Sequence, residues 1–199
     1  MIETTDYATG LSHLRKVLAR ARTIGKIAAV GRDRDEVLAR YQPLFKPPAI
    51  GQISAEEFVS FLYVENNKHW YSLYRQRSNL TADLTRLQRA LTLLLDEGQP
   101  IASRLEEAVA MVRGLGKAVA TAMLLVAYPQ QYGVWNKRSE EAMQRLKLWP
   151  AFPRGMPFGQ KYERVNQQLL RLAADLEVDL WTLDYLWWAV EEPEPGTEV

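Results

Sequence analysis

The sequence lacks cysteine and contains only two histidines, His13 and His69, among its 199 residues. Without cysteine the chain cannot form disulfides, thiolate metal sites, iron–sulfur clusters or a cysteine nucleophile. Two histidines cannot build a histidine-rich metal centre, so we predict no metal site. Carboxylates, amides, hydroxyls, aromatic rings and basic side chains remain for chemistry.

The sequence also lacks a long apolar segment. The longest one, residues 118–128, is interrupted by Thr121 and is about half as long as a membrane span. Residues 1–6 are polar and acidic, unlike the apolar core of a signal peptide. These features predict a cytoplasmic protein without a membrane partner, and nothing in the sequence indicates an obligate protein partner.

Net charge is nearly absent, because 25 basic residues stand against 24 acidic ones. Taken alone, this balance argues against a nucleic-acid partner. The charge is nevertheless segregated: residues 175–199 carry eight acidic side chains and no basic one, which leaves +9 on residues 1–174. A basic body with an acidic end is compatible with a phosphate-binding face, although solvated helix faces explain it equally well.

Strand signals are nearly absent too, whereas apolar residues recur at helical spacing along most of the chain. We expect an all-α fold of about eight or nine helices. Asp33 with Glu36 resembles a capping box that opens a short helix through Arg40. A second capping box, Ser54 with Glu57, opens a helix whose apolar face is expected to continue toward residue 65.

The helical pattern covers nearly the whole chain and contains no internal repeat. We predict one helical domain over residues 1–192, which can divide into two lobes with a cleft between them. Residues 193–199 are expected to form a disordered acidic tail. In the last expected helix, Trp181, Trp187 and Trp188 have the spacing of core residues.

Two glycines, Gly114 and Gly116, separate two amphipathic helical patterns. Glycine permits a tight turn here and exposes backbone N–H groups at the start of the second helix. Such N–H groups, together with the helix dipole, favour an anion such as a DNA phosphate. A plain turn with a glycine cap explains the same residues without any ligand.

The residues around this turn are Arg113, Gly114, Leu115, Gly116 and Lys117, followed by the small residues Ala118, Ala120 and Ala122. This segment resembles the hairpin of the helix-hairpin-helix superfamily of base-excision DNA glycosylases, with Arg113 in place of the usual proline. The resemblance covers residues 101–148. It implies a two-lobed all-α fold, double-stranded DNA as partner, contacts to DNA by the hairpin, and removal of a damaged or modified base. It implies no cofactor, but leaves room for a monovalent cation at the hairpin.

The family's catalytic aspartate lies about twenty residues after the second glycine, where this chain has Asn136. An amide lacks the negative charge that stabilises the cationic sugar formed as a base departs. Asn136 therefore orients a water molecule beside another carboxylate, marks a DNA-binding relative without catalysis, or is only a helix N-cap. The lysine of bifunctional family members is replaced by Ala118, so a Schiff-base lyase is not expected.

Polar and aromatic residues crowd the region after the helix at residue 58. Glu65 and His69 are four residues apart, so we expect them on one helix face, where they can act as acid and base. Glu65 is the first candidate for the missing carboxylate. The alternative is that His69 is a buried polar anchor.

In the resembling family, polar residues after such a helix fill the gap that an extruded base leaves. Asn66 and Asn67 take that place here, and Arg75 is a candidate phosphate contact. The candidates for stacking on an extruded base are Trp70, Tyr71 and Trp135, although core packing explains Trp135 equally well. Three functions remain open: a monofunctional DNA glycosylase, a DNA-binding module without catalysis, and a helical interaction protein with no role on nucleic acid.

Overall fold

The computed structural model describes residues 4–190, and the predicted tail at 193–199 lies outside them. Within residues 4–190 the chain forms eleven α-helices, two short 3-10 helices and no strand, which confirms the all-α prediction. Two of the helices, α4 and α5, are single turns that the apolar pattern does not mark. The bounds are α1 (Thr4–Thr23), α2 (Lys26–Tyr41), η1 (Ala49–Gln52), α3 (Ala55–Leu62), α4 (Val64–Asn67), η2 (Leu73–Gln76), α5 (Arg77–Leu80), α6 (Leu84–Leu94), α7 (Ile101–Met111), α8 (Lys117–Ala127), α9 (Lys137–Arg145), α10 (Phe158–Leu176) and α11 (Leu180–Ala189).

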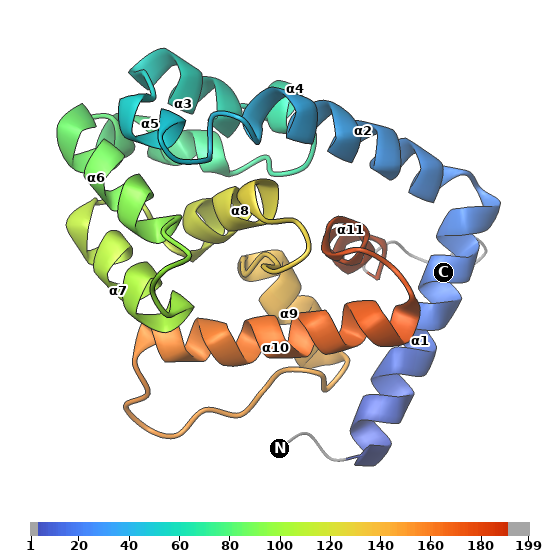
Figure 1. Cartoon of the computed structure of the whole chain (residues 1–199). Coiled ribbons are helices and arrows are strands. Elements are labelled where there is room, and N and C mark those ends of the chain that lie inside the picture. Colours follow the sequence, from blue (N-terminus) through green and yellow to red (C-terminus); the bar gives the residue numbers. More distant parts are fainter. Residues whose placement is uncertain (1–3, 191–199) are drawn as a thin grey trace.

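Helix α8 is the centre of the fold. Every residue from Val119 to Ala127 is buried, so α8 is covered on all sides by other elements. In Figure 1, α8 lies in the middle, with α10 on one side, α2 and α3 on the other, and α6 and α7 beside it. None of the helices within residues 4–190 combines the length and the apolar character that a bilayer span requires.

Helices α7 and α10 approach so closely that only glycine fits between them. A Cβ on Gly159 would lie 1.8 Å from the carbonyl oxygen of Ala102 in α7. The Gly159 N–H also donates a 2.6 Å hydrogen bond to a carboxylate oxygen of Glu106. This contact fixes the orientation of α7, and therefore of the turn that joins α7 to α8.

The start of α2 differs from the sequence-based prediction. The helix begins at Lys26, directly after Gly25 in the left-handed conformation, so Asp33 and Glu36 lie inside it and form no capping box. The prediction was wrong because the apolar face extends back to Val30, which is buried, ahead of the expected start.

The start of α3 confirms the prediction. The Ser54 hydroxyl accepts a hydrogen bond from the Glu57 N–H at 3.1 Å, and the Glu57 carboxylate accepts one from the Ser54 N–H at 2.9 Å. The helix is shorter than expected, since α3 ends at Leu62 and Tyr63 has extended backbone. Residues beyond Tyr63 therefore do not continue its apolar face.

Candidate nucleic-acid interface

The turn between α7 and α8 is a tight hairpin built on its two glycines. Gly114 has φ +93°, and a Cβ there would lie 3.0 Å from the side-chain oxygen of Gln76. Leu115 is fully buried, and its N–H donates a 3.1 Å hydrogen bond to the carbonyl of Val112. Gly116 is the N-cap residue of α8 and has no side chain that could cap the helix. The first N–H groups of α8 therefore receive no capping side chain.

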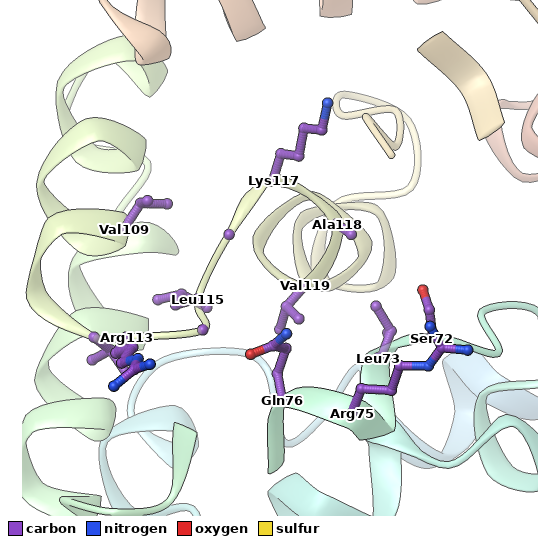
Figure 2. A pocket seen from close by; sticks show the side chains of 13 residues that line it. Ser72, Leu73, Arg75, Gln76, Val109, Arg113, Leu115, Lys117, Ala118 and Val119 are labelled. Carbon is purple, nitrogen blue, oxygen red and sulfur yellow. The ribbon is translucent and has the colours of Figure 1, made fainter. Parts of the chain in front are cut away.

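A cavity of about 510 Å³ opens at this turn, and we call it the hairpin cavity. Arg113 borders it on one side, Arg75 on the other, and Gln76 lies between them (Figure 2). Both arginines are exposed. Unpaired helix N–H groups and two guanidinium groups at one opening favour an anionic ligand.

Lys117 belongs to the hairpin but points away from the arginines, as Figure 2 shows. Its ammonium forms an ion pair and hydrogen bond with Glu140 and lies 4.8 Å from the centre of the Trp135 ring. The Trp135 indole N–H also donates to Glu140, at 3.0 Å. Partial burial alone would raise the pKa of Glu140, but the hydrogen bonds from Lys117 and Trp135 outweigh it and lower that pKa. Lys117 is therefore placed to contribute its backbone rather than its charge to a ligand.

A second cavity, of about 240 Å³, adjoins the first, and we call it the aromatic pocket. The two cavities share three lining residues, namely Ser72, Leu73 and Ala118. The aromatic pocket is further lined by Trp70, Tyr71, Asn136, Lys137, Arg138, Glu141 and Trp188. Helix α8 thus begins between a basic opening and an aromatic one.

Three aromatic rings form walls of the aromatic pocket. Trp70 is 3% exposed, whereas Tyr71 is 69% exposed and lies at the rim. The ring of Tyr71 meets the ring of Trp188 at 5.9 Å, edge to face, and the Arg138 guanidinium lies 4.1 Å from the centre of Trp188. Trp188 was predicted to be a core residue, and this was wrong because it lies at the end of the helix, where the core is open.

The other two tryptophans of α11 confirm the core prediction, since Trp181 and Trp187 are each 1% exposed. The sequence did contain a signal that Trp188 lies at this pocket, because Trp188 follows Asp184 by four residues. That spacing places both side chains on one face of α11, the face that meets Trp70.

Asn136 is the N-cap of α9, as one of the three interpretations predicted. Its side-chain oxygen accepts a 2.9 Å hydrogen bond from the Ser139 N–H, and the Ser139 hydroxyl accepts one from the Asn136 N–H at 3.0 Å. Asn136 also lines the aromatic pocket. The cap and a role in that pocket are therefore compatible, because the cap uses only the amide oxygen.

A buried cluster lies directly behind Trp70, and we call it the Asp184 cluster. Asp184 is 2% exposed. One of its carboxylate oxygens accepts a 2.9 Å hydrogen bond from the indole N–H of Trp70, and the same oxygen lies 2.9 Å from Nε2 of His69 without forming a hydrogen bond to it. The ring of Trp181 packs against both, with its centre 5.1 Å from that of Trp70 and 5.6 Å from that of His69.

The predicted pair of Glu65 and His69 on one helix face was wrong. Helix α4 ends at Asn67, and Lys68 has φ +60°, so the chain turns between the two residues. Glu65 is exposed and lines neither cavity, whereas His69 is buried against Asp184. The alternative, a buried histidine anchor, fits His69, although its partner is a carboxylate rather than the backbone.

Asn66 and Asn67 are used inside the fold and not at the cavities. Asn67 is completely buried: its amide N–H groups donate to the carbonyls of Phe61 and Trp70, and its oxygen accepts from the N–H groups of His69 and Trp70. A direct DNA contact by Asn67 is thereby contradicted. The Asn66 side-chain amide donates a hydrogen bond to the carbonyl of Ser60 and accepts one from Arg40. Asn66 lines neither cavity.

For Trp135 the sequence leaves open both stacking on a base and core packing, and the structure shows that it packs within the fold. It is 6% exposed and stacks on Phe158, with ring centres 5.2 Å apart and planes inclined by 20°. Trp149 packs on it as well, at 5.8 Å. Trp135 is next to Asn136 in the sequence, and this position did not indicate that its ring packs away from the aromatic pocket.

Within residues 4–190, no three histidine, aspartate or glutamate side chains gather as a metal site would require. Comparisons of the chain with protein-family models, with curated proteins and with solved structures find no match. The function is therefore argued from the chemistry of the two cavities.

Proposed function

We propose that the protein binds double-stranded DNA at the hairpin cavity and accepts an extruded base in the aromatic pocket. The observation that carries this proposal is the adjacency of the two cavities, which share Ser72, Leu73 and Ala118. A base is covalently tied to its own phosphates, so a site for an extruded base must adjoin a site for the backbone. A two-lobed helix-hairpin-helix fold stays a prediction that this arrangement supports.

The hairpin cavity has the chemistry for a phosphate. The first N–H groups of α8 are uncapped, and the positive end of the helix dipole faces the opening. Arg75 and Arg113 supply exposed guanidinium groups, which bind phosphate oxygens with two parallel hydrogen bonds. None of these groups reads a base, so this contact positions the duplex without selecting a sequence.

The aromatic pocket has the chemistry for a base. A base that leaves the duplex loses its stacking, and a protein compensates by placing aromatic rings on its faces. Tyr71 and Trp188 offer two such rings at one opening, and Trp70, which is 3% exposed, forms its inner wall. Trp70 is held by the Asp184 hydrogen bond, so at least one wall is in place before a ligand arrives.

The proposal is tested by the salt dependence of duplex binding. Arg75→Ala and Arg113→Ala are each expected to weaken binding and to lower the slope of log K against log salt by about one. Arg86→Ala is the matched control, since Arg86 is exposed but lines neither cavity. Equal losses for all three variants would contradict the assignment of the hairpin cavity as the DNA site. No salt-dependent binding by the unaltered protein would contradict the proposal as a whole and favour a helical interaction protein.

Base excision is the second candidate function, favoured by one observation. Among the residues that line the aromatic pocket, Glu141 supplies a carboxylate. A negative charge beside the sugar stabilises the cationic transition state of glycosidic cleavage. Duplexes with damaged or modified bases, treated to reveal abasic sites, test this directly. Abasic product that disappears in Glu141→Gln supports excision. If no duplex gives abasic product, excision is contradicted and DNA binding is the only function that stands.

A further inference from the structure

We infer that the corner between α1 and α2 is a second contact for the DNA backbone, separated from the hairpin cavity by the aromatic pocket. We call it the α1–α2 corner and define it by four basic residues around the turn, namely Lys16, Arg20, Arg22 and Lys26. The inference rests on the proposed function, because a second backbone contact has a role only if the duplex binds at the hairpin cavity and an extruded base enters the aromatic pocket.

The charge of the α1–α2 corner is not neutralised inside the fold. Residues 7–32 contain six basic side chains and no acidic one. Two of the six are left out of the corner, because Arg15 is held by a 3.2 Å hydrogen bond to the carbonyl of Asp175 and Arg32 is followed directly by Asp33. Within residues 4–190 the four corner residues form no ion pair with a carboxylate, and all except Arg20 are exposed. Their positive charge is therefore available to an anionic partner.

Helix α11 connects the α1–α2 corner to the aromatic pocket. Figure 1 shows α11 beside α1 and α2. At the end of α11, Ala189 lines a small hollow together with Arg20 and Ile24. The preceding residue, Trp188, lines the aromatic pocket, and consecutive Cα atoms are about 3.8 Å apart. The corner therefore meets the aromatic pocket at Trp188, whereas the hairpin cavity meets it at Ser72, Leu73 and Ala118.

This order of basic regions matches the way in which an extruded nucleotide is attached to its duplex. Such a nucleotide has backbone on its 5′ side and on its 3′ side, so contacts on both sides of the pocket hold the duplex around it. The hairpin cavity supplies Arg75 and Arg113 on one side. Lys137 and Arg138 line the pocket itself, and the α1–α2 corner adds cations where α11 ends.

The acidic side chains of the elements packed on α1 and α2 do not cancel the charge of the corner. Asp179, at the start of α11, forms an ion pair with Arg34, and Asp175 of α10 accepts a 2.6 Å hydrogen bond from the hydroxyl of Tyr7. In the sequence, Glu191 and Glu192 follow Val190 directly, and the four basic residues of the corner outnumber them. All variants are compared in the full chain, so these acidic charges stay constant.

An anionic membrane surface is the competing partner, because Ile24 in the turn is 57% exposed among these cations. A helix that lies in a membrane surface presents an apolar face to the lipid. The apolar face of α1 is used inside the fold, where Leu14 and Leu18 are buried. One exposed isoleucine offers little apolar area, so the corner fits the phosphates of DNA better than a lipid surface.

The experiment removes two exposed cations from the corner and measures binding of a duplex with one central unpaired nucleotide over a range of salt concentrations. Arg22→Ala/Lys26→Ala is expected to weaken binding and to lower the slope of log K against log salt by about two. Arg86→Ala/Arg89→Ala is the matched control, since both arginines are exposed on α6 and line neither the hairpin cavity nor the aromatic pocket. Equal slopes for the two double variants would overturn the inference while the proposed function stands. If the unaltered protein shows no salt-dependent binding, the proposed function itself fails.

Shortened duplexes test the placement of the corner. Each keeps the unpaired nucleotide and loses most of the arm on its 5′ side or on its 3′ side. One of them is expected to bind the corner variant and the unaltered protein equally, whereas the other still distinguishes them, because the corner and the hairpin cavity contact opposite arms. A difference that persists with both shortened duplexes, or disappears with both, would contradict this placement.

Vesicles that contain phosphatidylserine test the competing partner. The unaltered protein and the corner variant are expected to show the same weak attachment to them. Vesicle binding that is lost in Arg22→Ala/Lys26→Ala, with unchanged duplex binding, would assign the corner to a lipid surface and overturn the inference. Thermal unfolding checks that each double variant is folded.

Discussion

The hairpin cavity and the Asp184 cluster both draw on the segment at residues 69–76, yet their polar groups are used in opposite ways. At the hairpin cavity, Arg75 and Arg113 are exposed and the first N–H groups of α8 are uncapped. In the Asp184 cluster, the carboxylate of Asp184 is turned toward Trp70 and His69 inside the fold. Groups of the first kind are available to a ligand, whereas groups of the second kind hold the shape of the site.

Residue type alone does not distinguish these two uses. Asn67 and His69 were expected at the ligand because they are polar and lie beside aromatic residues, but Asn67 is hydrogen-bonded within the protein and the His69 ring is buried against Asp184. Arg75 was expected there for its charge, and it does line the cavity. The difference lies in which side chains find an internal partner, and single-residue changes can test that division.

The largest effect is expected at Asn67, which carries the most internal hydrogen bonds of the region. Asn67→Ala leaves backbone groups of Phe61, His69 and Trp70 buried without partners, so we expect a loss of about 3 kcal/mol in the free energy of unfolding. Chemical denaturation measures it. Asn66→Ala, at a partly exposed neighbour, is the control and is expected to cost about 1 kcal/mol. Similar losses for both would contradict the assignment of Asn67 as the buried anchor.

A smaller loss is expected at Asp184. Asp184→Val leaves the indole N–H of Trp70 without an acceptor and is expected to cost about 2 kcal/mol. Asp184→Asn retains an oxygen that accepts this hydrogen bond, so it should lose less. Thermal unfolding compares the two. An equal loss in both variants would show that the charge of Asp184, and not its hydrogen bond, stabilises the cluster.

The two glycines of the hairpin are expected to differ by about 1–2 kcal/mol in the cost of an added methyl group. Gly114→Ala places a side chain at φ +93° and 3.0 Å from Gln76, so the free energy of unfolding should fall. Gly116→Ala meets nothing within 4 Å and has negative φ, so its stability should stay within about 0.5 kcal/mol of the original. The reverse order would mean that the turn is built differently.

The smallest effect concerns pH and the ion pair beside the hairpin. Because the pKa of Glu140 is lowered in the folded state, its ionised form stabilises the fold above the ordinary glutamate pKa of 4.5. That contribution declines as the pH falls through the lowered folded-state pKa. Glu140→Gln should therefore be less stable at pH 7 by under about 1 kcal/mol and lose this disadvantage in acid. Unfolding curves at pH 7 and pH 3 decide it, and a difference that persists in acid would refute the ion-pair explanation.

The sequence predicted the all-α class and the long helices, about half of the hairpin cavity, and three of the ten residues that line the aromatic pocket. Apolar spacing marks the long helices because burial of one face repeats every turn, and the glycine pair marks the hairpin because few other residues allow that turn. The single-turn helix α4 escaped prediction, since four residues are too few to show a period. The error at Glu65 and His69 follows directly from it.

The aromatic pocket shows a second limit of sequence reasoning. Trp70, Tyr71 and Asn136 were predicted, but Arg138, Glu141 and Trp188 were not. Trp188 lies 52 residues after Asn136, and only the packing of α11 against α9 brings them to one opening. Such long-range contacts cannot be read from local spacing. Conversely, Trp135 is next to Asn136 in the sequence, but its ring packs on Phe158 and not in the pocket.

The burial of α8 has a mechanical consequence for any duplex that binds at its N-terminus. Nine consecutive residues of this helix are enclosed in the core, so the hairpin cannot tilt or slide to follow the shape of its ligand. The duplex must then bend to meet a rigid surface, and the energy of that deformation depends on how stiff its base steps are. Flexible pyrimidine–purine steps, mismatches and unpaired nucleotides would therefore be preferred by stiffness alone, at positions that no side chain touches.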